Sequence, residues 1–167
     1  MRILITGPEC TGKSAMSMAL SQQLGIPYLE EYARTYLEEH GPDYNLQTIL
    51  QISTEHQNQL ARFPSNQPMI LDTYLYNFLI WAEDKYGQSP RAIVNAIEQT
   101  NPFDFVLLMY PDIEWVQDGL REDADRRMLL LEKFQGLLEA RNENYHIIKG
   151  EGPSRINSAL EFIQPNI

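Results

Sequence analysis

The chain has 167 residues, of which 43% are hydrophobic and 22% charged, a composition typical of a globular protein that buries a core. This length fits one domain over residues 1–167, because two halves of that size would each have a poor core. The formal net charge of −10 excludes the broad basic surface of a nucleic-acid-binding protein, so we expect no nucleic-acid partner.

The cysteine count and the hydropathy bear on the compartment. Cys10 is the only cysteine, so no internal disulfide can form, and a lone thiol suits a reducing environment. No stretch approaches the roughly 20 apolar residues that cross a bilayer, and the N-terminus lacks the pattern of a secretory signal. We therefore expect a cytoplasmic protein without a membrane partner.

The first 60 residues alternate between short apolar runs and apolar residues at helical spacing. The run over 2–6 predicts a strand, and the spacing over 16–24 predicts a helix that Gly25 ends. A short second strand is predicted over 26–29, followed by helices over about 32–39 and 46–60.

The second half of the chain repeats this alternation. Ser89 and Pro90 are suited to begin a helix, as N-cap and first-turn residue. The other predicted elements are strands over 69–72, 105–109 and 145–148 and helices over 75–86, 130–138 and 156–163.

Strands separated by helices predict an α/β fold in three layers, with a mainly parallel five-stranded sheet covered on both faces. Parallel strands need crossover connections, and helices supply them. Ligands of such folds bind beyond the carboxyl ends of the strands. Candidate site residues are therefore sought just after each predicted strand.

The loop after the first strand reads GPECTGKS over residues 7–14 and fits the P-loop pattern G-x-x-x-x-G-K-[ST]. The strand before it and the helix after it make a chance match improbable. In a P-loop, backbone N–H groups surround the phosphates, the lysine reaches the β- and γ-phosphates, and the hydroxyl binds Mg²⁺. The sequence thus predicts ATP and Mg²⁺ as cofactors, held by Gly7, Glu9, Cys10, Thr11, Gly12, Lys13 and Ser14.

Carboxylates follow two other predicted strands. Asp72 is placed to hold Mg²⁺ with Ser14 or to orient the acceptor hydroxyl, although it could instead simply cap the next helix. Of Glu30 and Glu31, alternation points one toward the site, where it could bind ribose hydroxyls or accept a proton; the alternative is a solvated helix start. Arg34 could pair with Glu30 or reach a phosphate.

Aromatic and basic side chains complete the candidate set. The helix after Asp72 is rich in aromatic residues, most of them expected in the core, and Tyr76 and Trp81 are the candidates to line a pocket. Three arginines lie in the polar segment 112–127, which we expect to be a lid that neutralises developing charge; the alternative is a solvated helix start. They are Arg121, Arg126 and Arg127.

Together these motifs resemble P-loop kinases such as the ribosylnicotinamide kinase domain of bacterial NAD-regulator proteins. The stretches that resemble it are GPECTGKS at 7–14, EYAR at 31–34, ILDT at 70–73, NPFD at 101–104 and EWVQDGLR at 114–121. The resemblance covers nearly the whole chain, with Cys10 in place of the usual serine. It implies a nucleoside- or nucleotide-kinase-like sheet, ATP with Mg²⁺, and phosphorylation of the ribose 5′-hydroxyl of nicotinamide riboside.

The expected roles combine this resemblance with the residues. We expect Lys13, Asp72, Glu31, Arg121 and Arg126 to be catalytic, and Glu31, Arg34, Asp72, Tyr76 and Trp81 to bind the nucleoside substrate. By analogy with related kinases, Arg127 contacts the nucleotide and the segment 149–155, with Pro153, lies against its adenine.

Two alternative functions remain open. One is a kinase for another nucleoside or for a nucleoside monophosphate, which would need a basic acceptor site such as Arg34 or Arg62. The other is an ATP-binding or ATPase switch.

Overall fold

The computed structural model describes residues 1–64 and 66–164, in which strands and helices alternate as predicted. The strands are β1 (Arg2–Thr6), β2 (Tyr28–Leu29), β3 (Met69–Asp72), β4 (Phe105–Met109) and β5 (Tyr145–Ile148). The helices are α1 (Lys13–Leu24), α2 (Tyr32–His40), α3 (Leu46–Leu60), α4 (Leu75–Tyr86), α5 (Arg91–Glu98), α6 (Arg127–Ala140) and α7 (Pro153–Ile163).

The five strands form one sheet in the order β2-β3-β1-β4-β5, and every neighbouring pair is parallel. This confirms the predicted parallel sheet. β1 lies in the middle, so the chain leaves it toward β2 on one side and reaches β4 on the other. That reversal of strand order is where open α/β sheets bind their ligands.

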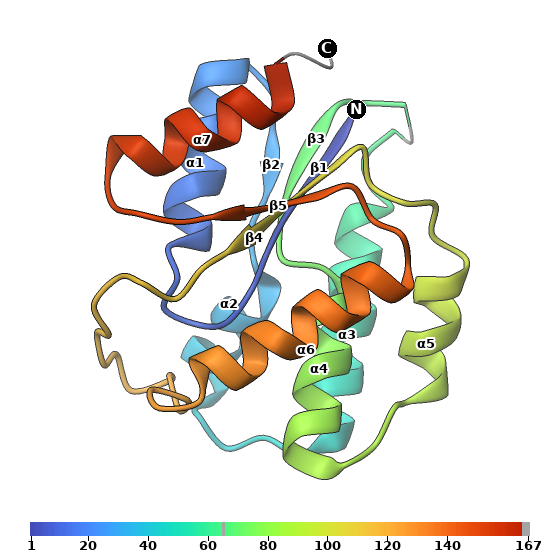
Figure 1. Cartoon of the computed structure of the whole chain (residues 1–167). Coiled ribbons are helices and arrows are strands. Elements are labelled where there is room, and N and C mark those ends of the chain that lie inside the picture. The colour runs from blue at the N-terminus through green and yellow to red at the C-terminus, as the bar shows by residue number, and fades with distance from the viewer. Residues whose placement is uncertain (65, 165–167) are drawn as a thin grey trace.

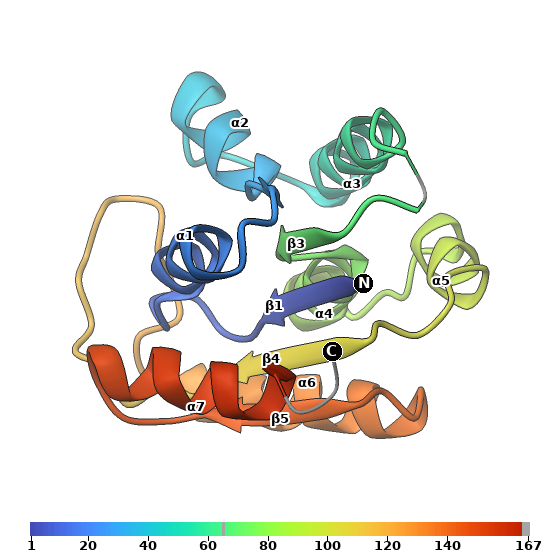
Figure 2. The same cartoon turned by 90° about the horizontal axis from the view of Figure 1, so that it is seen from above.

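Helices cover both faces of the sheet, which gives the three predicted layers (Figures 1 and 2). Alternation along β1 sorts its side chains between two cores. Ile3 and Ile5 pack in one core with residues of α1 and α7. Leu4 packs in the other core, with residues of α3, α4 and α6. Because all five strands are parallel, their carboxyl ends lie at one edge of the sheet, and α1 starts there.

One predicted helix start is wrong. Ser89 does not cap α5; its hydroxyl instead donates to a carboxylate oxygen of Glu83 at 2.6 Å. The helix begins at Arg91, with Pro90 in the N-cap position at φ −62°. An extended Pro90 still stops α4 and α5 from merging, so the error is confined to one residue.

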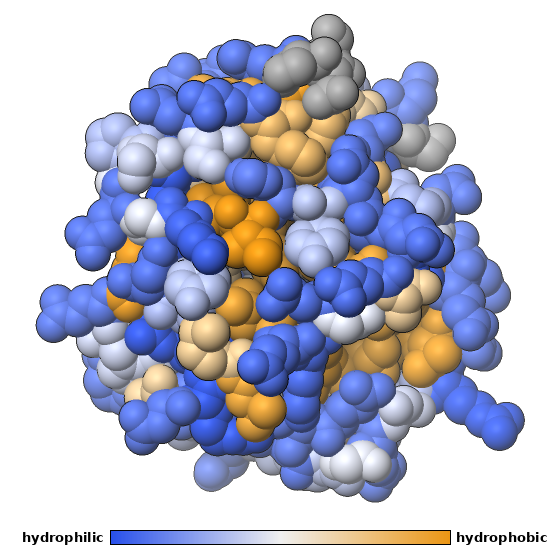
Figure 3. Space-filling model, viewed as in Figure 1, coloured by the Kyte–Doolittle hydropathy of each residue, from blue (hydrophilic) through white to orange (hydrophobic). Residues whose placement is uncertain are grey.

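The surface follows the composition. Hydrophilic side chains cover most of the face shown in Figure 3, and apolar ones show between them where the edge strand β5 crosses the view. β5 is flanked by α6 and α7, and Tyr145, His146 and Ile147 are half-buried there. Within the described residues, none of the helices has the length and apolar character that spanning a membrane requires.

His56 of α3 is a titratable side chain in the core. It has no exposed surface, and its ring packs edge-on to Phe78 with the ring centroids 5.6 Å apart. Among the described residues, neither ring nitrogen has a hydrogen-bond partner. Burial therefore lowers the pKa of His56 from 6.5 to about 4.

This burial predicts a loss of stability in mild acid. The unfolded chain takes up a proton at His56 near pH 6.5, but the folded chain resists it down to about pH 4. The free energy of unfolding therefore carries no penalty from His56 above pH 6.5. It falls by up to about 3 kcal/mol as the pH drops toward 4. Denaturant unfolding of the wild type and of His56→Leu between pH 7 and pH 4 should show a smaller loss in the variant. Exposed His40, changed to leucine, is the matched control; parallel profiles for wild type and His56→Leu would contradict the prediction.

Candidate active site

The P-loop lies between β1 and α1 and depends on residues at positive φ. Gly7 has φ 132°, and a side chain there would come within 2.9 Å of the Met109 carbonyl oxygen. Gly12 has φ 79° and Cys10 has φ 52°, a conformation that costs a residue with a side chain about 1 kcal/mol or more. The loop is thus held in a fixed and partly strained shape by its surroundings.

Two side chains of the P-loop converge on one carbonyl. The ammonium group of Lys13 donates to the Pro8 carbonyl oxygen at 2.9 Å, and the hydroxyl of Thr11 donates to the same oxygen at 2.8 Å. Lys13 is nearly buried, at 9% exposure, so its charge lies within the loop. Ser14 is exposed at the start of α1. The loop therefore has the arrangement of a phosphate-binding cradle.

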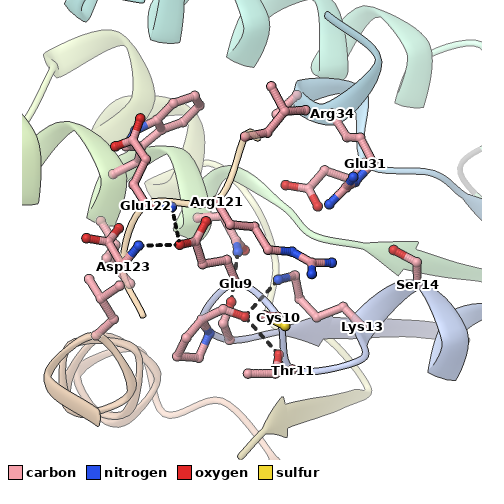
Figure 4. Close-up of a pocket in the computed structure, with 18 of the residues that line it drawn as sticks. Glu9, Cys10, Thr11, Lys13, Ser14, Glu31, Arg34, Arg121, Glu122 and Asp123 are labelled. Carbon is pink, nitrogen blue, oxygen red and sulfur yellow. Dashed lines mark hydrogen bonds between the residues drawn. The ribbon is translucent and has the colours of Figure 1, made fainter. Parts of the chain in front are cut away.

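A cavity of about 380 Å³ opens above the P-loop. Figure 4 shows the side chains of Glu31, Arg34 and Arg121 pointing into this space, with Lys13 below them. The polar lining residues come from the P-loop, from α2 with its N-cap, from α4 and from the segment after β4. The apolar and aromatic lining residues include Ala33, Leu37, Tyr44, Ile80, Trp81, Leu130 and Phe134.

The structure separates the two carboxylates that follow β2 and β3. Glu31 lines the cavity, whereas Asp72 is 1% exposed and is not among the residues that line it. The Asp72 Oδ1 atom has no partner among the described residues. Burial, together with the neighbouring charge of Glu31, raises the pKa of Asp72 to about 6, although Lys13, Ser14 and Arg34 oppose the rise. One oxygen of Asp72 thus lacks a hydrogen-bond partner among the described residues, and burial beside the P-loop disfavours the ionised form of this carboxyl.

Of the glutamate pair at 30 and 31, only one side chain faces the cavity, as strand alternation predicts. Glu30 instead accepts a hydrogen bond from the Tyr28 hydroxyl at 3.1 Å. Glu31 stands at the N-cap of α2 without a side-chain cap bond, and it lines the cavity, where its charge interacts with those of Arg34 and Asp72. Glu31 therefore lies at the helix start, as the alternative has it, and its carboxylate also reaches the cavity.

The segment 110–126 packs against the P-loop and contacts it directly. A carboxylate oxygen of Glu9 accepts the N–H groups of Glu122 at 2.7 Å and Asp123 at 2.5 Å (Figure 4). The thiol of Cys10 accepts the N–H of Val116 at 3.3 Å. Burial raises the pKa of Glu9, and the two N–H bonds oppose the rise. Glu9 and Cys10 therefore bind this segment rather than pointing at the phosphate cradle.

Ion pairs tie the same segment to α4. Lys85 contacts carboxylates of Glu122 at 2.9 Å and Asp123 at 3.1 Å. Asp84, whose side chain is 3% exposed, accepts both terminal nitrogens of Arg126 at 2.8 and 2.7 Å. Asp84 and Lys85 were not predicted as site residues, because their only signal in the sequence is a charged pair at the end of an apolar helix.

The predicted arginines divide between the cavity and its walls. Arg34 lines the cavity and pairs with Asp118 at 3.0 Å and with Glu38, so of its two alternatives the pair with Glu30 is wrong. Arg121 also lines the cavity and forms an ion pair with Asp118, whose carboxylate oxygen lies 3.2 Å from the arginine Nε. Arg126 is occupied by Asp84, away from the phosphate cradle.

The prediction that Tyr76 lines the pocket is wrong. Its ring has no exposed surface and packs edge-on against Tyr74 and Phe103, with centroids 5.6 and 6.0 Å apart. Its hydroxyl donates to the buried carboxylate of Glu143. Residues 76 and 81 lie five positions apart on α4, so they face different sides of the helix.

Trp81 does line the cavity and packs edge-on against Tyr44, with ring centroids 4.6 Å apart. Tyr44 lies in the loop between α2 and α3, and only the tertiary fold brings it to the site.

Two basic side chains contact the P-loop from outside the cradle. Arg127 at the start of α6 donates to the carbonyl oxygen of Cys10 at 3.1 Å. Arg155 of α7 donates to that of Thr11 at 2.6 Å. Pro153 is the exposed first residue of α7, two residues before Arg155. Arg155 itself was predicted only as the end of the segment 149–155.

Comparisons of fold place the chain among nucleoside and nucleotide kinase structures. A crystal structure of NadR protein in complex with NR superposes with a TM-score of 0.82 at 21% identity, over 98% of this chain and 50% of that one. Deoxyadenosine kinase from M. mycoides, with products dCMP and dCDP, gives 0.72 at 15% identity, over 99% of this chain and all of that one. Thymidylate kinase from Ehrlichia chaffeensis gives 0.65 at 17% identity, over 99% and 97%.

The similarity to NadR has a limited extent, because the chain spans half the length of that protein. A search of curated proteins by sequence gave no match. The profile of a protein family does match, over residues 2–155. Because that match covers nearly the whole chain, including the P-loop and the segment after β4, the chain belongs to the family described as an AAA domain.

Proposed function

We propose that the chain is an ATP-dependent kinase that phosphorylates the ribose 5′-hydroxyl of a nucleoside, with nicotinamide riboside as its substrate. The observation that carries this proposal is a P-loop that shares one cavity with the carboxylate of Glu31 and with apolar and aromatic side chains. The cradle suits a triphosphate and the apolar and aromatic side chains suit a nucleoside base, so donor and acceptor would lie side by side.

The P-loop residues would hold the triphosphate, with Lys13 at the β- and γ-phosphates. Ser14 and Asp72 fit a Mg²⁺ site, because the exposed hydroxyl stands beside a buried carboxylate whose Oδ1 lacks a partner among the described residues. Bound Mg²⁺ would neutralise phosphate charge. Glu31 would orient the acceptor hydroxyl and take its proton, and Arg121, on leaving its ion pair with Asp118, would stabilise the charge of the transferring group.

The charges favour a nucleoside over a nucleoside monophosphate as acceptor. The cations that line the acceptor side already have carboxylate partners, since Arg34 pairs with Asp118 and Lys85 pairs with Glu122 and Asp123. A phosphate-bearing acceptor would have to break these pairs. Arg62, the other candidate for an acceptor phosphate, is 72% exposed and pairs with Glu55.

Nicotinamide riboside fits this acceptor side because its ring carries a positive charge. Trp81 and Tyr44 offer aromatic surface to a flat cation, and Glu31 adds negative charge at the same cavity. The similarity of fold to a NadR structure in complex with NR supports the same choice. A neutral nucleoside would gain less from these groups.

The test is ATP consumption with Mg²⁺ across a panel of nucleosides that includes nicotinamide riboside, with each product identified by mass spectrometry. We expect the mononucleotide from nicotinamide riboside at a kcat/KM at least about tenfold above that for neutral nucleosides, the factor that 1.4 kcal/mol represents. If only another nucleoside is phosphorylated efficiently, that nucleoside and not nicotinamide riboside is the substrate, and the kinase proposal stands. Nucleotide binding without any phosphorylated acceptor would overturn the kinase and favour a nucleotide-dependent switch.

A further inference from the structure

We propose that Arg155 and Arg127 are positioning residues that aim the backbone N–H groups of the P-loop at the nucleotide phosphates. They act from outside the loop, by holding two of its carbonyl groups. This inference rests on the proposed binding of a nucleoside triphosphate and adds the residues that prepare the loop for it.

Arg155 is a buried cation that joins three segments. It is 5% exposed, and it donates to the carbonyl oxygens of Thr11 at 2.6 Å and Tyr110 at 2.5 Å. It also donates to the carboxylate of Asp112 at 2.7 Å, whose other oxygen accepts the N–H of Gly150 at 2.7 Å. Arg155 thus fixes the P-loop against the end of β4 and the turn before α7. A buried charge with such partners is costly to displace.

Arg127 holds the adjacent carbonyl in the same way. One of its terminal nitrogens donates to the carbonyl oxygens of Cys10 and Ile113, both at 3.1 Å. Its guanidinium lies over the ring of Trp115, 5.5 Å from the centroid. Two consecutive P-loop carbonyls, those of Cys10 and Thr11, are therefore bound by arginines from different helices.

Peptide geometry turns these two contacts into an orientation of the loop. No peptide bond among the described residues is cis, and in a trans peptide the C=O of one residue points opposite to the N–H of the next. When the carbonyls of Cys10 and Thr11 point outward to the arginines, the N–H groups of Thr11 and Gly12 point inward. Neither N–H donates to another group in the part of the chain that the structure describes. Both are thus available to phosphate oxygens.

Gly12 is adapted to this contact as well as to its positive φ. A side chain at residue 12 would come within 3.3 Å of the Arg155 Nη1 atom. Arg155 therefore approaches the loop closely at the peptide that it orients. An arginine does this better than a lysine, because its planar fork can bind several acceptors at once.

The experiment measures the affinity of the full chain for Mg·AMP-PNP and for inorganic triphosphate by calorimetry. We expect Arg155→Met and Arg127→Met each to weaken both ligands by at least about tenfold, since each substitution releases one P-loop carbonyl and with it the orientation of one N–H donor. Arg155→Lys should recover only a small part of this loss. Arg91→Met, at the exposed first residue of α5 on the far side of the molecule, should bind as the wild type does.

The lysine variant separates positioning from charge. If the arginine served only as a positive charge near the phosphates, Arg155→Lys would restore full affinity, and that result would overturn the inference. If Arg155→Met does not fold, the affinities of Arg127→Met and Arg155→Lys for the two ligands test the proposal in its place. In these variants the amide NMR signals of Thr11 and Gly12 should shift less on adding triphosphate than in the wild type; equal shifts would count against the proposal.

The outcomes also separate this inference from the proposed kinase activity. A wild type that binds triphosphate but phosphorylates no nucleoside would defeat the kinase and leave the positioning role standing. An Arg155→Met variant that binds as tightly as the wild type would defeat the positioning role and leave the kinase. A wild type that binds no triphosphate would defeat both.

Discussion

Replacing Lys13 with methionine should reduce ATP-dependent phosphorylation by roughly a thousandfold or more, because the loop loses the nearly buried positive charge of the ammonium group. The ammonium group lies inside the cradle, 2.9 Å from the Pro8 carbonyl oxygen. Methionine keeps most of the stem, so the packing around it should survive. The measurement is steady-state turnover with nicotinamide riboside and saturating Mg·ATP.

Two further variants show whether position or charge alone matters. Lys13→Arg keeps the charge but brings a planar fork into a site shaped for a compact ammonium, so we expect it to stay at least about tenfold below the wild type. Arg91→Met removes an exposed charge and should leave turnover unchanged. Turnover of Lys13→Met within a few-fold of the wild type would show that this loop does not hold the reacting phosphates.

The sequence predicted the elements and the P-loop because both have local signals. Apolar runs and helical spacing located the five strands, and strand ends then pointed to Glu31 and Asp72. GPECTGKS requires only a strand before it and a helix after it. The predicted N-cap at Ser89 was wrong because a serine hydroxyl can also donate to a neighbouring carboxylate, here that of Glu83. The sequence does not distinguish a capping serine from one that bonds a carboxylate.

The roles of the arginines could not be predicted because they depend on partners far apart in sequence. Arg155 is 144 residues from Thr11, and Arg126 is 42 residues from Asp84. Composition showed a polar segment with three arginines, but only tertiary packing decides which of them face the cavity. The prediction that Tyr76 lines the pocket was wrong for the same reason, because its hydrogen-bond partner Glu143 lies 67 residues away in the sequence.

The two carboxylates at the site should give different defects, since one lines the cavity and the other is buried and does not line it. Glu31→Gln should lower kcat by about 10²–10⁴, the usual contribution of a general base, with little change in the KM for ATP. Asp72→Asn should instead raise the Mg²⁺ concentration needed for half-maximal activity, because it weakens the proposed metal site. Initial rates measured across Mg²⁺ and nucleoside concentrations separate these effects.

Stability adds a second, independent readout for Asp72. Burial and the nearby Glu31 raise its pKa above the ordinary value, so at pH 7 the folded chain carries an ionised group that the unfolded chain tolerates better. The stabilising contribution of a raised pKa is present in acid and is lost as the pH rises through the folded-state value. Asp72→Asn should therefore stabilise the fold at pH 7 by roughly 1–2 kcal/mol while it impairs activity.

At pH 4 the gain from Asp72→Asn should shrink, because the wild-type carboxyl is then protonated in the folded chain. A variant less stable than the wild type at pH 7 would mean that Asp72 is a structural acid. An unchanged Mg²⁺ requirement in Asp72→Asn would mean that Asp72 does not hold the metal. A severe loss of kcat in Asp72→Asn together with normal turnover in Glu31→Gln would make Asp72, and not Glu31, the general base.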